Sequence, residues 1–385
     1  MSKVSIREVR KYDNGLIKEN LYKCLSEIGF ELARLKGKRV TVKPNLLLSS
    51  KPEQAIVTHP EFFRAAVQII KDAGGVPVLI ESPAIHSLSK VFRATGYDKV
   101  IKEECVEVDL EQDIMSITND KGLRYKHFDI MKSIAGTDFI FNLPKFKTHG
   151  LTYVTGAMKN LFGLIPGMAK TQWHLKANTR ELFSDFLVDY FEAVSSIFIK
   201  PKGIVHLMDA IVGMEGNGPS TAGKPREIGA VIVSEDAVAT DFIASSLVGF
   251  NPKLIKTISI AAGRGLGKKG FNEIEFDRNI FNKLKLDKFE SAPLPFQVRM
   301  EKFKRINNLI KRLTVERPVP IEGKCTLCYQ CRQICSAQAI DKGSTVASFN
   351  YDKCIRCFCC IEVCPEAAIR IQGNILSRIF SPKKG

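Results

Sequence analysis

Eight cysteines between residues 325 and 364 repeat one spacing twice. The first run is Cys325-x2-Cys328-x2-Cys331-x3-Cys335, and the second is Cys354-x2-Cys357-x2-Cys360-x3-Cys364, followed by Pro365. Three thiolates three residues apart suit three corners of a [4Fe–4S] cube in one tight loop, and the fourth cysteine of each run then completes the other cube. We therefore predict two clusters, one bound by Cys325, Cys328, Cys331 and Cys364, the other by Cys354, Cys357, Cys360 and Cys335.

Other roles for these cysteines fit the spacing less well. Paired CxxC motifs also suit tetrahedral zinc, but two complete four-cysteine runs in tandem favour clusters. A disulfide framework fits poorly, because all of the 11 cysteines except Cys24 and Cys105 fall in this one region. We expect Cys359, which lies outside both ligand sets, to fill space beside a cluster.

Such clusters pass electrons one at a time, so the sequence predicts an external electron donor or acceptor. Exposed clusters need a reducing compartment, and we therefore expect the protein in the cytoplasm. The first residues form no apolar signal core, and no stretch reaches the roughly 18 apolar residues of a membrane span.

A second set of candidate residues is cationic. Lys145 and Lys147 flank one phenylalanine in a proline-bounded segment, which we interpret as a loop after a strand. With Lys43 and Lys159 they predict a site in which several ammonium groups suit a phosphate or carboxylate and depress one another's pKa. Solvated surface is the alternative for each lysine taken singly.

Three further residues have the chemistry to move protons. His149 directly follows the lysine pair and precedes a glycine, and a histidine donates or accepts a proton near neutral pH. Asp209 and Glu215 lie in the glycine-rich segment 209–219, where two carboxylates could orient a hydroxyl or accept a proton. A hydrogen-bonded loop histidine and a purely structural turn are the alternatives.

Alternating strand and helix patterns over residues 1–296 must position these side chains. Short apolar runs predict strands at 39–45, 76–81, 138–143, 203–208 and 229–234. Helical periodicity predicts helices over 21–35, after His59, near 182–199 and from Asp236 to 248. Such alternation predicts an α/β fold with a mostly parallel sheet covered by helices. Ligands bind these sheets beyond the carboxyl ends of the strands, where the lysines are expected.

The remainder of the chain divides into three segments. Residues 297–320 are predicted to form a basic amphipathic linker helix, which packs on the first domain or contacts a membrane surface or a partner through 297–317. Residues 321–374 hold the cysteine runs, and 375–385 form a basic tail. The net charge of +16 can attract anionic metabolites, anionic lipid or nucleic acid, with ordinary lysine-rich solubility as the alternative. We do not expect nucleic acid as a partner, since no interleaved aromatic and basic motif is present.

Several segments together resemble one known family. They are KPN at 43–45, FNLPKFKTHG at 141–150, GAMKNLFG at 156–163 and DAIVGMEGNGP at 209–219, followed by SEDAVATD. The combination resembles the uncharacterised iron–sulfur family called domain of unknown function 362, which is often fused to a small α+β ferredoxin domain of the bacterial two-[4Fe–4S] type. The resemblance implies one pocket built from Lys43, Asn45, Lys145, Lys147, His149, Lys159, Asn160, Asp209 and Glu215. Ser336 departs from the proline usual after the fourth cysteine and leaves the ligands intact.

These observations favour an iron–sulfur oxidoreductase. Low-potential electrons from two [4Fe–4S] clusters would reach an anionic small molecule in the lysine-rich cleft, with His149, Lys145 and Asp209 as catalytic residues. A flavin or other two-electron cofactor stays open but is not indicated, because the GxGxxG letters at 265–270 lie between a helix end and a strand. An electron-transfer subunit that docks a partner enzyme and a non-redox enzyme with structural clusters stay open as alternatives.

Overall fold

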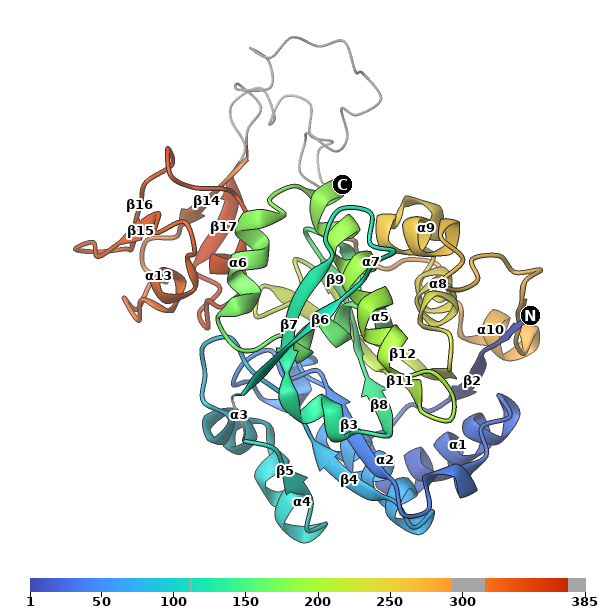
Figure 1. Cartoon of the computed structure of the whole chain (residues 1–385). Helices are drawn as coiled ribbons and strands as arrows, with labels where there is room; N and C mark the ends of the chain where they lie inside the picture. Colours follow the sequence, from blue (N-terminus) through green and yellow to red (C-terminus); the bar gives the residue numbers. More distant parts are fainter. Residues whose placement is uncertain (111–112, 293–315, 373–385) are drawn as a thin grey trace.

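The computed structural model describes residues 1–110, 113–292 and 316–372, and its larger part is built on a nine-stranded sheet (Figure 1). The strand order is β10-β9-β11-β8-β3-β4-β5, with β12 paired to β11 and β2 paired to β12. The strands are β2 (Ser5–Glu8), β3 (Arg39–Pro44), β4 (Val76–Leu79), β5 (Glu107–Val108), β8 (Phe139–Leu143), β9 (Lys145–His149), β10 (Tyr153–Thr155), β11 (Gly203–Gly216) and β12 (Gly223–Ser234).

Parallel pairings dominate this sheet. β3 pairs with β4 and β8, β4 with β5, and β11 with β8 and β9, all in parallel. The antiparallel pairings are those of β12 with β11 and β2, and of β10 with β9. The predicted mixed α/β fold with a mostly parallel sheet is confirmed.

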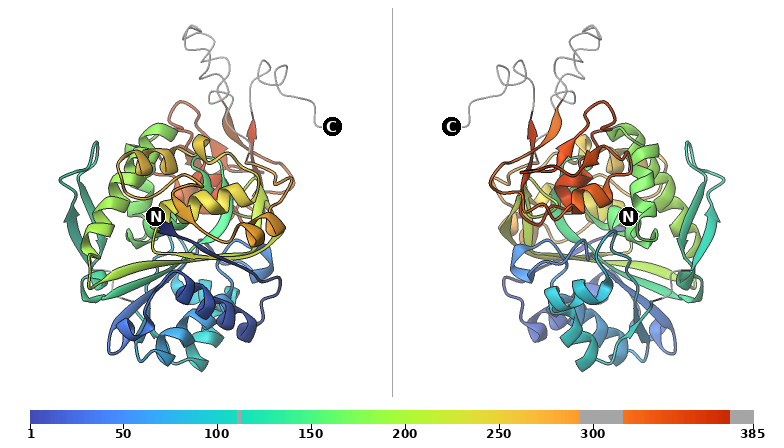
Figure 2. Two further views of the ribbon diagram at one scale, coloured as in Figure 1. Left: turned by 90° about the vertical axis from the view of Figure 1, so that its right-hand side faces the viewer. Right: turned by 90° about the vertical axis from the view of Figure 1, so that its left-hand side faces the viewer.

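Helices cover both faces of the sheet, as two side views show (Figure 2). One layer holds α1 (Asn14–Glu27), α2 (Pro60–Asp72), α3 (Leu88–Thr95) and α4 (Tyr97–Glu103). The opposite layer holds α5 (Ala157–Leu161), α6 (Ala169–Lys176), α7 (Arg180–Ile197), α8 (Ala237–Leu247), α9 (Lys256–Gly263) and α10 (Arg278–Leu284). Side chains alternate along a strand. Phe139 and Phe141 of β8 therefore pack in the core under the first layer of helices, while Ile140 packs in the core under the opposite layer.

Local signals explain where the helices begin. His59 caps α2 through a hydrogen bond from Glu61 N to its Nδ1 (3.2 Å), and Asp236 caps α8 by accepting from Ala239 N (2.9 Å). Both predicted helix starts are confirmed. The single helix predicted over 21–35 is wrong, because α1 ends at Glu27 and Gly29, at φ 79°, turns the chain into a separate 3₁₀ turn.

Shorter elements complete the described residues. In the α/β domain they are the parallel pair β1 (Ser2–Lys3) and β13 (Ile274–Glu275) and the hairpin β6 (Ile114–Thr118) and β7 (His127–Met131). Residues 316–372 form the C-terminal module. It holds the helices α13 (Gln330–Ile334) and α14 (Cys359–Glu362), the pair β14 (Arg317–Pro320) and β17 (Ile369–Gln372), and the pair β15 (Ile340–Asp341) and β16 (Ser348–Phe349).

The predicted segments outside the cysteine runs are only partly described. Residues 317–320, predicted as the end of the linker helix, form strand β14 instead, because they pair with β17. The rest of the predicted linker helix up to residue 315, and the basic tail 375–385, lie outside the described residues. Within those that are described, no helix is both long and apolar enough to cross a membrane.

Candidate functional site

Strand β9 presents three of the predicted site residues on one face. The loop predicted at this place is wrong, because the chain resumes a strand directly after Pro144. Alternation along the strand puts Lys145, Lys147 and His149 on one side and Phe146 in the apolar core of the other. All three polar side chains are buried, so each requires polar partners of its own.

Lys145 belongs to a closed ion-pair network. Its Nζ donates to Asp209 Oδ2 (2.9 Å) and to the Tyr12 hydroxyl (2.6 Å). Tyr12 donates to Asp209 Oδ1 (2.9 Å), and the backbone N–H of His59 donates to Oδ2 (3.0 Å). Burial lowers the pKa of Lys145, although Asp209 opposes the shift. These partners satisfy both charged groups, as a structural buried pair requires.

Lys147 begins a chain of buried amides. Lys147 Nζ donates to Asn45 Oδ1 (2.8 Å), and Asn45 Nδ2 donates to Asn160 Oδ1 (3.1 Å). Asn160 Nδ2 donates to Asn142 Oδ1 (2.7 Å), whose own Nδ2 lies 2.9 Å from His206 Nδ1. The chain fixes the orientation of each amide, and it ties Lys147 to strands β8 and β11, to the residue that follows β3, and to α5.

His149 is held as a neutral imidazole. Its Nδ1 accepts hydrogen bonds from the backbone of Leu151 (3.0 Å) and Thr152 (3.3 Å), so the proton is on Nε2. Burial lowers the pKa of His149 well below its ordinary value, and nearby cations, led by Lys159, add to this effect. Nε2 lies 3.3 Å from Glu362 Oε1 of the C-terminal module. His149 therefore faces the junction between the two parts of the chain.

A cavity of about 110 Å³ lies at this junction. Its wall from the α/β domain contains four of the predicted pocket residues and three further titratable residues that were not predicted. They are Lys43, Asn45, Lys159 and Asn160, with Glu81, Lys170 and His174. The C-terminal module contributes Ile334, Cys359, Glu362 and Val363.

Lys43 and Glu81 form a buried pair at one end of the cavity. Lys43 Nζ lies 2.5 Å from Glu81 Oε2 and also donates to the Pro44 carbonyl (2.8 Å). Gly163 allows this approach, because a Cβ at that position would lie 2.5 Å from Lys43 Nζ. The pair is therefore packed directly against backbone.

Lys159 and Glu362 both line the cavity, and the charge of each shifts the pKa of the other. Burial lowers the pKa of Lys159, and the Glu362 carboxylate and Cys359 oppose the shift. Burial raises the pKa of Glu362, against the opposing effects of Lys159 and Lys147. Lys159 Nζ lies 6.0 Å from the Phe162 ring centroid and has no hydrogen-bonded partner among the described residues. It is a cation open to a ligand.

Helix α5, which carries Lys159 and Asn160, is positioned by a carboxylate from α8. Asp241 accepts from the backbone N–H of Ala157 (2.5 Å) and Met158 (3.3 Å), which satisfies two free donors at the start of the helix. Burial raises the pKa of Asp241 to about 7. Gly156 makes room for it, since a Cβ there would lie 2.1 Å from Asp241 Oδ1.

The structure does not bring all predicted pocket residues to the cavity. Lys145, Lys147, His149 and Asp209 lie behind its wall, in the contacts given above, and Glu215 accepts a hydrogen bond from the backbone of Glu290 (2.9 Å). The strand end predicted at Met208 is wrong, because β11 continues through the glycine-rich segment to Gly216.

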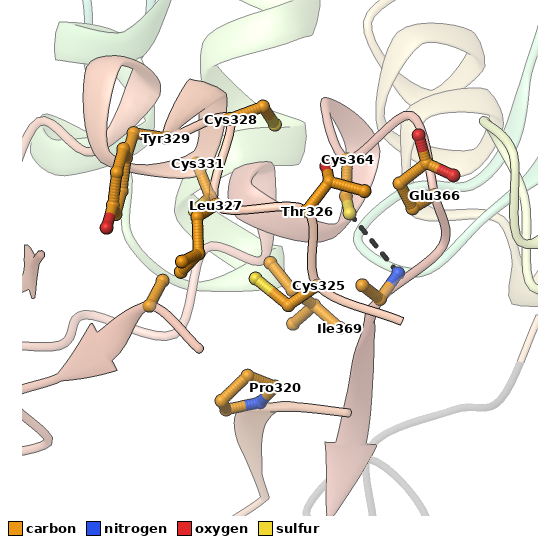
Figure 3. Close-up of a pocket in the computed structure, with 12 residues that line it drawn as sticks. Pro320, Cys325, Thr326, Leu327, Cys328, Tyr329, Cys331, Cys364, Glu366 and Ile369 are labelled. Atoms are coloured by element: carbon orange, nitrogen blue, oxygen red, sulfur yellow. Dashed lines mark hydrogen bonds between the residues drawn. The ribbon is translucent and has the colours of Figure 1, made fainter. Parts of the chain in front are cut away.

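Four of the predicted cluster ligands line a second cavity, shown in Figure 3. They are Cys325, Cys328, Cys331 and Cys364, the set predicted for one cluster. Cys364 Sγ accepts a hydrogen bond from Ala368 N (3.2 Å), and at the same place in the first run Cys335 Sγ accepts from Ala339 N (3.3 Å).

The two cysteine runs also share their backbone conformation. Positive φ occurs at Leu327 and Tyr329 in the first run and at the matching Arg356 and Phe358 in the second. The two cysteine loops thus follow the same tight backbone path. The cysteine spacing predicted a tight loop in each run but not these backbone angles.

Cys360, a predicted ligand of the second cluster, lies near cysteines of both predicted sets. Burial raises the pKa of the Cys360 thiol well above its ordinary value, and the cysteines that add to this effect are Cys357, Cys354, Cys331 and Cys335. In the described residues no group of three or more His, Cys, Asp or Glu side chains is arranged to hold a metal ion. The clusters therefore stay a prediction.

The C-terminal module contacts the α/β domain through its cysteine loops. Thr221 Oγ1 donates to the Cys364 carbonyl (2.6 Å), and His86 Nε2 lies 3.1 Å from Gln330 Oε1. Helix α14 carries Cys360 together with two cavity residues, Cys359 and Glu362. Cys359 is buried, as the prediction that it fills space requires.

Sequence reasoning missed several residues of the site. Glu81 is the last residue of the strand predicted at 76–81, so its position at a strand end was a usable signal. Lys170, His174 and Glu362 had none, because nothing local indicates that α6 and α14 border the same cavity.

Comparison with known proteins shows the family of this chain. The model described as "Domain of unknown function (DUF362)" matches residues 40–246. The chain belongs to that family. It is also 31% identical over 266 residues to "Thylakoid-associated protein sll1697" of Synechocystis sp., covering 68% of this chain and 79% of the relative.

A solved structure is more distantly similar. It is a crystal structure of a Thermotoga maritima protein, a Northeast Structural Genomics Consortium target, with 13% sequence identity and a TM-score of 0.37. The match covers 67% of this chain and 60% of that chain.

Proposed function

We propose that the protein is an iron–sulfur oxidoreductase that delivers low-potential electrons to an anionic small molecule in the cavity between the α/β domain and the C-terminal module. One observation carries this proposal: the four-residue helix α14 contains a predicted cluster ligand, Cys360, and two residues of the cavity wall, Cys359 and Glu362. A cluster bound there would lie directly behind the wall.

The arrangement of the cysteines fits two clusters. Cys325, Cys328, Cys331 and Cys364 line one cavity, and the matching backbone and Sγ hydrogen bonds of the two runs support a second site of the same kind. Hydrogen bonds to the sulfurs are one of the means by which proteins set cluster potentials. When bound, the clusters would supply single electrons at low potential.

Exposure suggests the direction of transfer. Cys328, a predicted ligand of the first cluster, is exposed, whereas no predicted ligand of the second cluster is exposed and its Cys360 adjoins the cavity residue Cys359. The first cluster would therefore exchange electrons with an external donor or acceptor, and the second would serve the cavity. Cys335 belongs to the second set, and its neighbour Ile334 also lines the cavity.

The charges around the cavity favour an anion. Three lysines line the cavity, Lys43, Lys159 and Lys170, and two more lie behind its wall, while the two carboxylates of the wall are Glu81 and Glu362. Because the lysines are partly or fully buried, an anionic group would relieve much of the cost of holding them there. Lys43, Lys159 and Lys170 would contact it, and Lys147, Asn45 and Asn160 would hold the wall in place.

A proton donor is available beside this wall. His149 has its proton on Nε2, which lies 3.3 Å from Glu362 Oε1 without forming a hydrogen bond to it. Burial raises the pKa of the Glu362 carboxyl group. Glu362 lines the cavity, so a proton would reach a reduced substrate from His149 through Glu362. Lys145 and Asp209 would act by holding the fold, which differs from the catalytic role that the sequence predicts for them.

Location and partners are part of the same proposal. We expect the protein in the cytoplasm, and the name of the thylakoid-associated relative fits a peripheral membrane contact through residues 297–317. An electron-carrier protein is the expected external partner.

The test is anaerobic. The reconstituted protein should contain about eight irons and eight sulfides; zinc in their place would overturn the cluster prediction. The reduced protein is then mixed with a panel of small anions while cluster absorbance is followed, in wild type, in Lys159→Met and in the control Lys176→Met, whose side chain is exposed on α6. Reoxidation by one compound class, lost in Lys159→Met only, is expected. Equal reoxidation in all three proteins would contradict the cavity mechanism and favour an electron-transfer subunit.

A further inference from the structure

Lys170 is a lysine of the cavity wall whose surroundings do not stabilise a positive charge. It is the second residue of α6, and its Nζ donates to the carbonyl oxygen of Ser82. Within the part of the chain that the structure describes, Lys170 has no carboxylate partner. Its position near the start of a helix also disfavours a cation, because that end of the helix dipole is positive.

The nearest carboxylate is already occupied. Glu81 accepts from Lys43 Nζ (2.5 Å), from Ser82 N (2.9 Å) and from Leu46 N (3.4 Å). Glu81 is thus a buried carboxylate that acts on both Lys43 and Lys170, and it contacts Lys43. A second ammonium beside the pair would be repelled by Lys43 without a counter-charge of its own, so the amine form of Lys170 is favoured.

The backbone around Lys170 is fixed. Ser82 Oγ accepts from Gly167 N (2.7 Å), and the Ser82 carbonyl holds Lys170 Nζ, so the segment after β4 and the start of α6 clamp each other. Lys170, Thr171 and His174 line the cavity from this helix. Fixed lysine amines beside another cation are the arrangement that makes lysine a nucleophile.

We propose that Lys170 is a reactive amine that forms an imine with a small carbonyl compound bearing an anionic group, such as a 2-oxo acid. The lone pair of Nζ attacks the carbonyl carbon, a C=N bond replaces the C=O bond, and the oxygen leaves as water with both amine hydrogens. No oxidant or reductant is needed. The proposal rests on the cavity as the ligand site and not on electron transfer to it.

Size and charge define the substrate class. The cavity of about 110 Å³ is several times the roughly 30 Å³ that one water occupies in the liquid, which leaves room for a compound of a few heavy atoms. Lys159, which has no hydrogen-bonded partner among the described residues, supplies the cation for its anionic group. Burial lowers the pKa of Lys170 to about 7. At neutral pH its amine fraction then exceeds that of an exposed lysine by roughly a hundredfold or more.

The experiment traps the imine in the full-length protein. Pyruvate and sodium cyanoborohydride are added at pH 7 with the clusters oxidised, and the modified peptide is identified by mass spectrometry. One reduced adduct on Lys170 is expected, at least tenfold more abundant than on Lys176, an exposed lysine of the same helix. Lys170→Arg should lose the adduct, and Lys176→Arg should keep it.

Two comparisons separate the parts of the proposal. Lys159→Met should reduce the adduct with pyruvate but not with acetone, which lacks the carboxylate. Equal labelling of Lys170 and Lys176 in the wild-type protein would overturn the proposal without depending on whether any variant folds. An adduct in a protein whose clusters do not react with the anion panel would support the imine and contradict the proposed oxidoreductase; the reverse result would do the opposite.

Discussion

Replacing Lys145 by methionine tests whether the Lys145–Asp209 pair is structural, as its contacts indicate, or catalytic, as the sequence predicts. Both side chains are at most 1% exposed. Removing one partner of such a pair leaves an uncompensated buried charge, which typically costs about 3–5 kcal/mol of unfolding free energy. Asp209 would keep Tyr12 and the backbone of His59 as donors, so we expect a loss near the lower end of that range.

A double variant isolates the charge from the packing. In Lys145→Met/Asp209→Asn a neutral amide replaces the carboxylate. This amide can donate to the Tyr12 hydroxyl while still accepting from the backbone of His59. The double variant should therefore be more stable than the sum of the two single losses predicts, by about 1–3 kcal/mol.

The assay uses the chain's one tryptophan, Trp173. It lies on α6 and packs against Phe186 of α7, so its fluorescence during urea unfolding reports on the α/β domain. A Lys145→Met protein of unchanged stability that no longer reoxidises its clusters would refute the structural role and restore the catalytic one.

Three further predictions concern the cavity. Gly163→Ala should destabilise the α/β domain by about 1–3 kcal/mol in the same urea assay, because the added methyl meets the Lys43–Glu81 pair, whereas Gly263→Ala, with open space around its Cβ, should not. Labelling of Lys170 by an amine reagent should rise through pH 7 and then level off, since its lowered pKa makes the amine dominant above that pH; a rise that continues to pH 10 would contradict this. Thr221→Val should speed amide exchange around α14 by removing its hydrogen bond to Cys364; unchanged exchange there would mean that this bond does not hold the module.

The strands at 76–81, 138–143 and 203–208 were predictable because buried parallel strands are short continuous apolar runs. The lysine strand β9 was not, since Pro144 indicated a break, and the chain resumes pairing with β11 directly after it. The length of β11 was hidden by Gly213. That glycine suggested a turn, but it is needed in the strand because a Cβ would lie 2.6 Å from Ile228 Cδ1.

The candidate site was predictable only where residues follow strands. Lys43 and Asn45 end one predicted strand, Lys159 was predicted with the other lysines, and the resemblance to the family added Asn160; all four line the cavity. Lys170 and Glu362 are 192 residues apart in the sequence, by subtraction of their numbers, and meet only because the C-terminal module packs beside α6. Neither the hydrophobic periodicity nor the spacing of residues in the sequence shows that these two segments border one cavity. The same limit explains why Lys145 and Asp209 were predicted as pocket residues, although their partners Tyr12 and His59 enclose them.

The most direct test of the account is an anaerobic redox titration of Lys159→Met, followed by electron paramagnetic resonance, with Lys176→Met as the control. Lys159 lies opposite Cys359 and Glu362 of α14, next to the predicted second cluster. Loss of this cation should lower the midpoint potential of one cluster by roughly tens of millivolts and change the other less, because the interaction weakens with distance. Two potentials that stay unchanged, or that shift equally, would contradict a cluster beside the cavity.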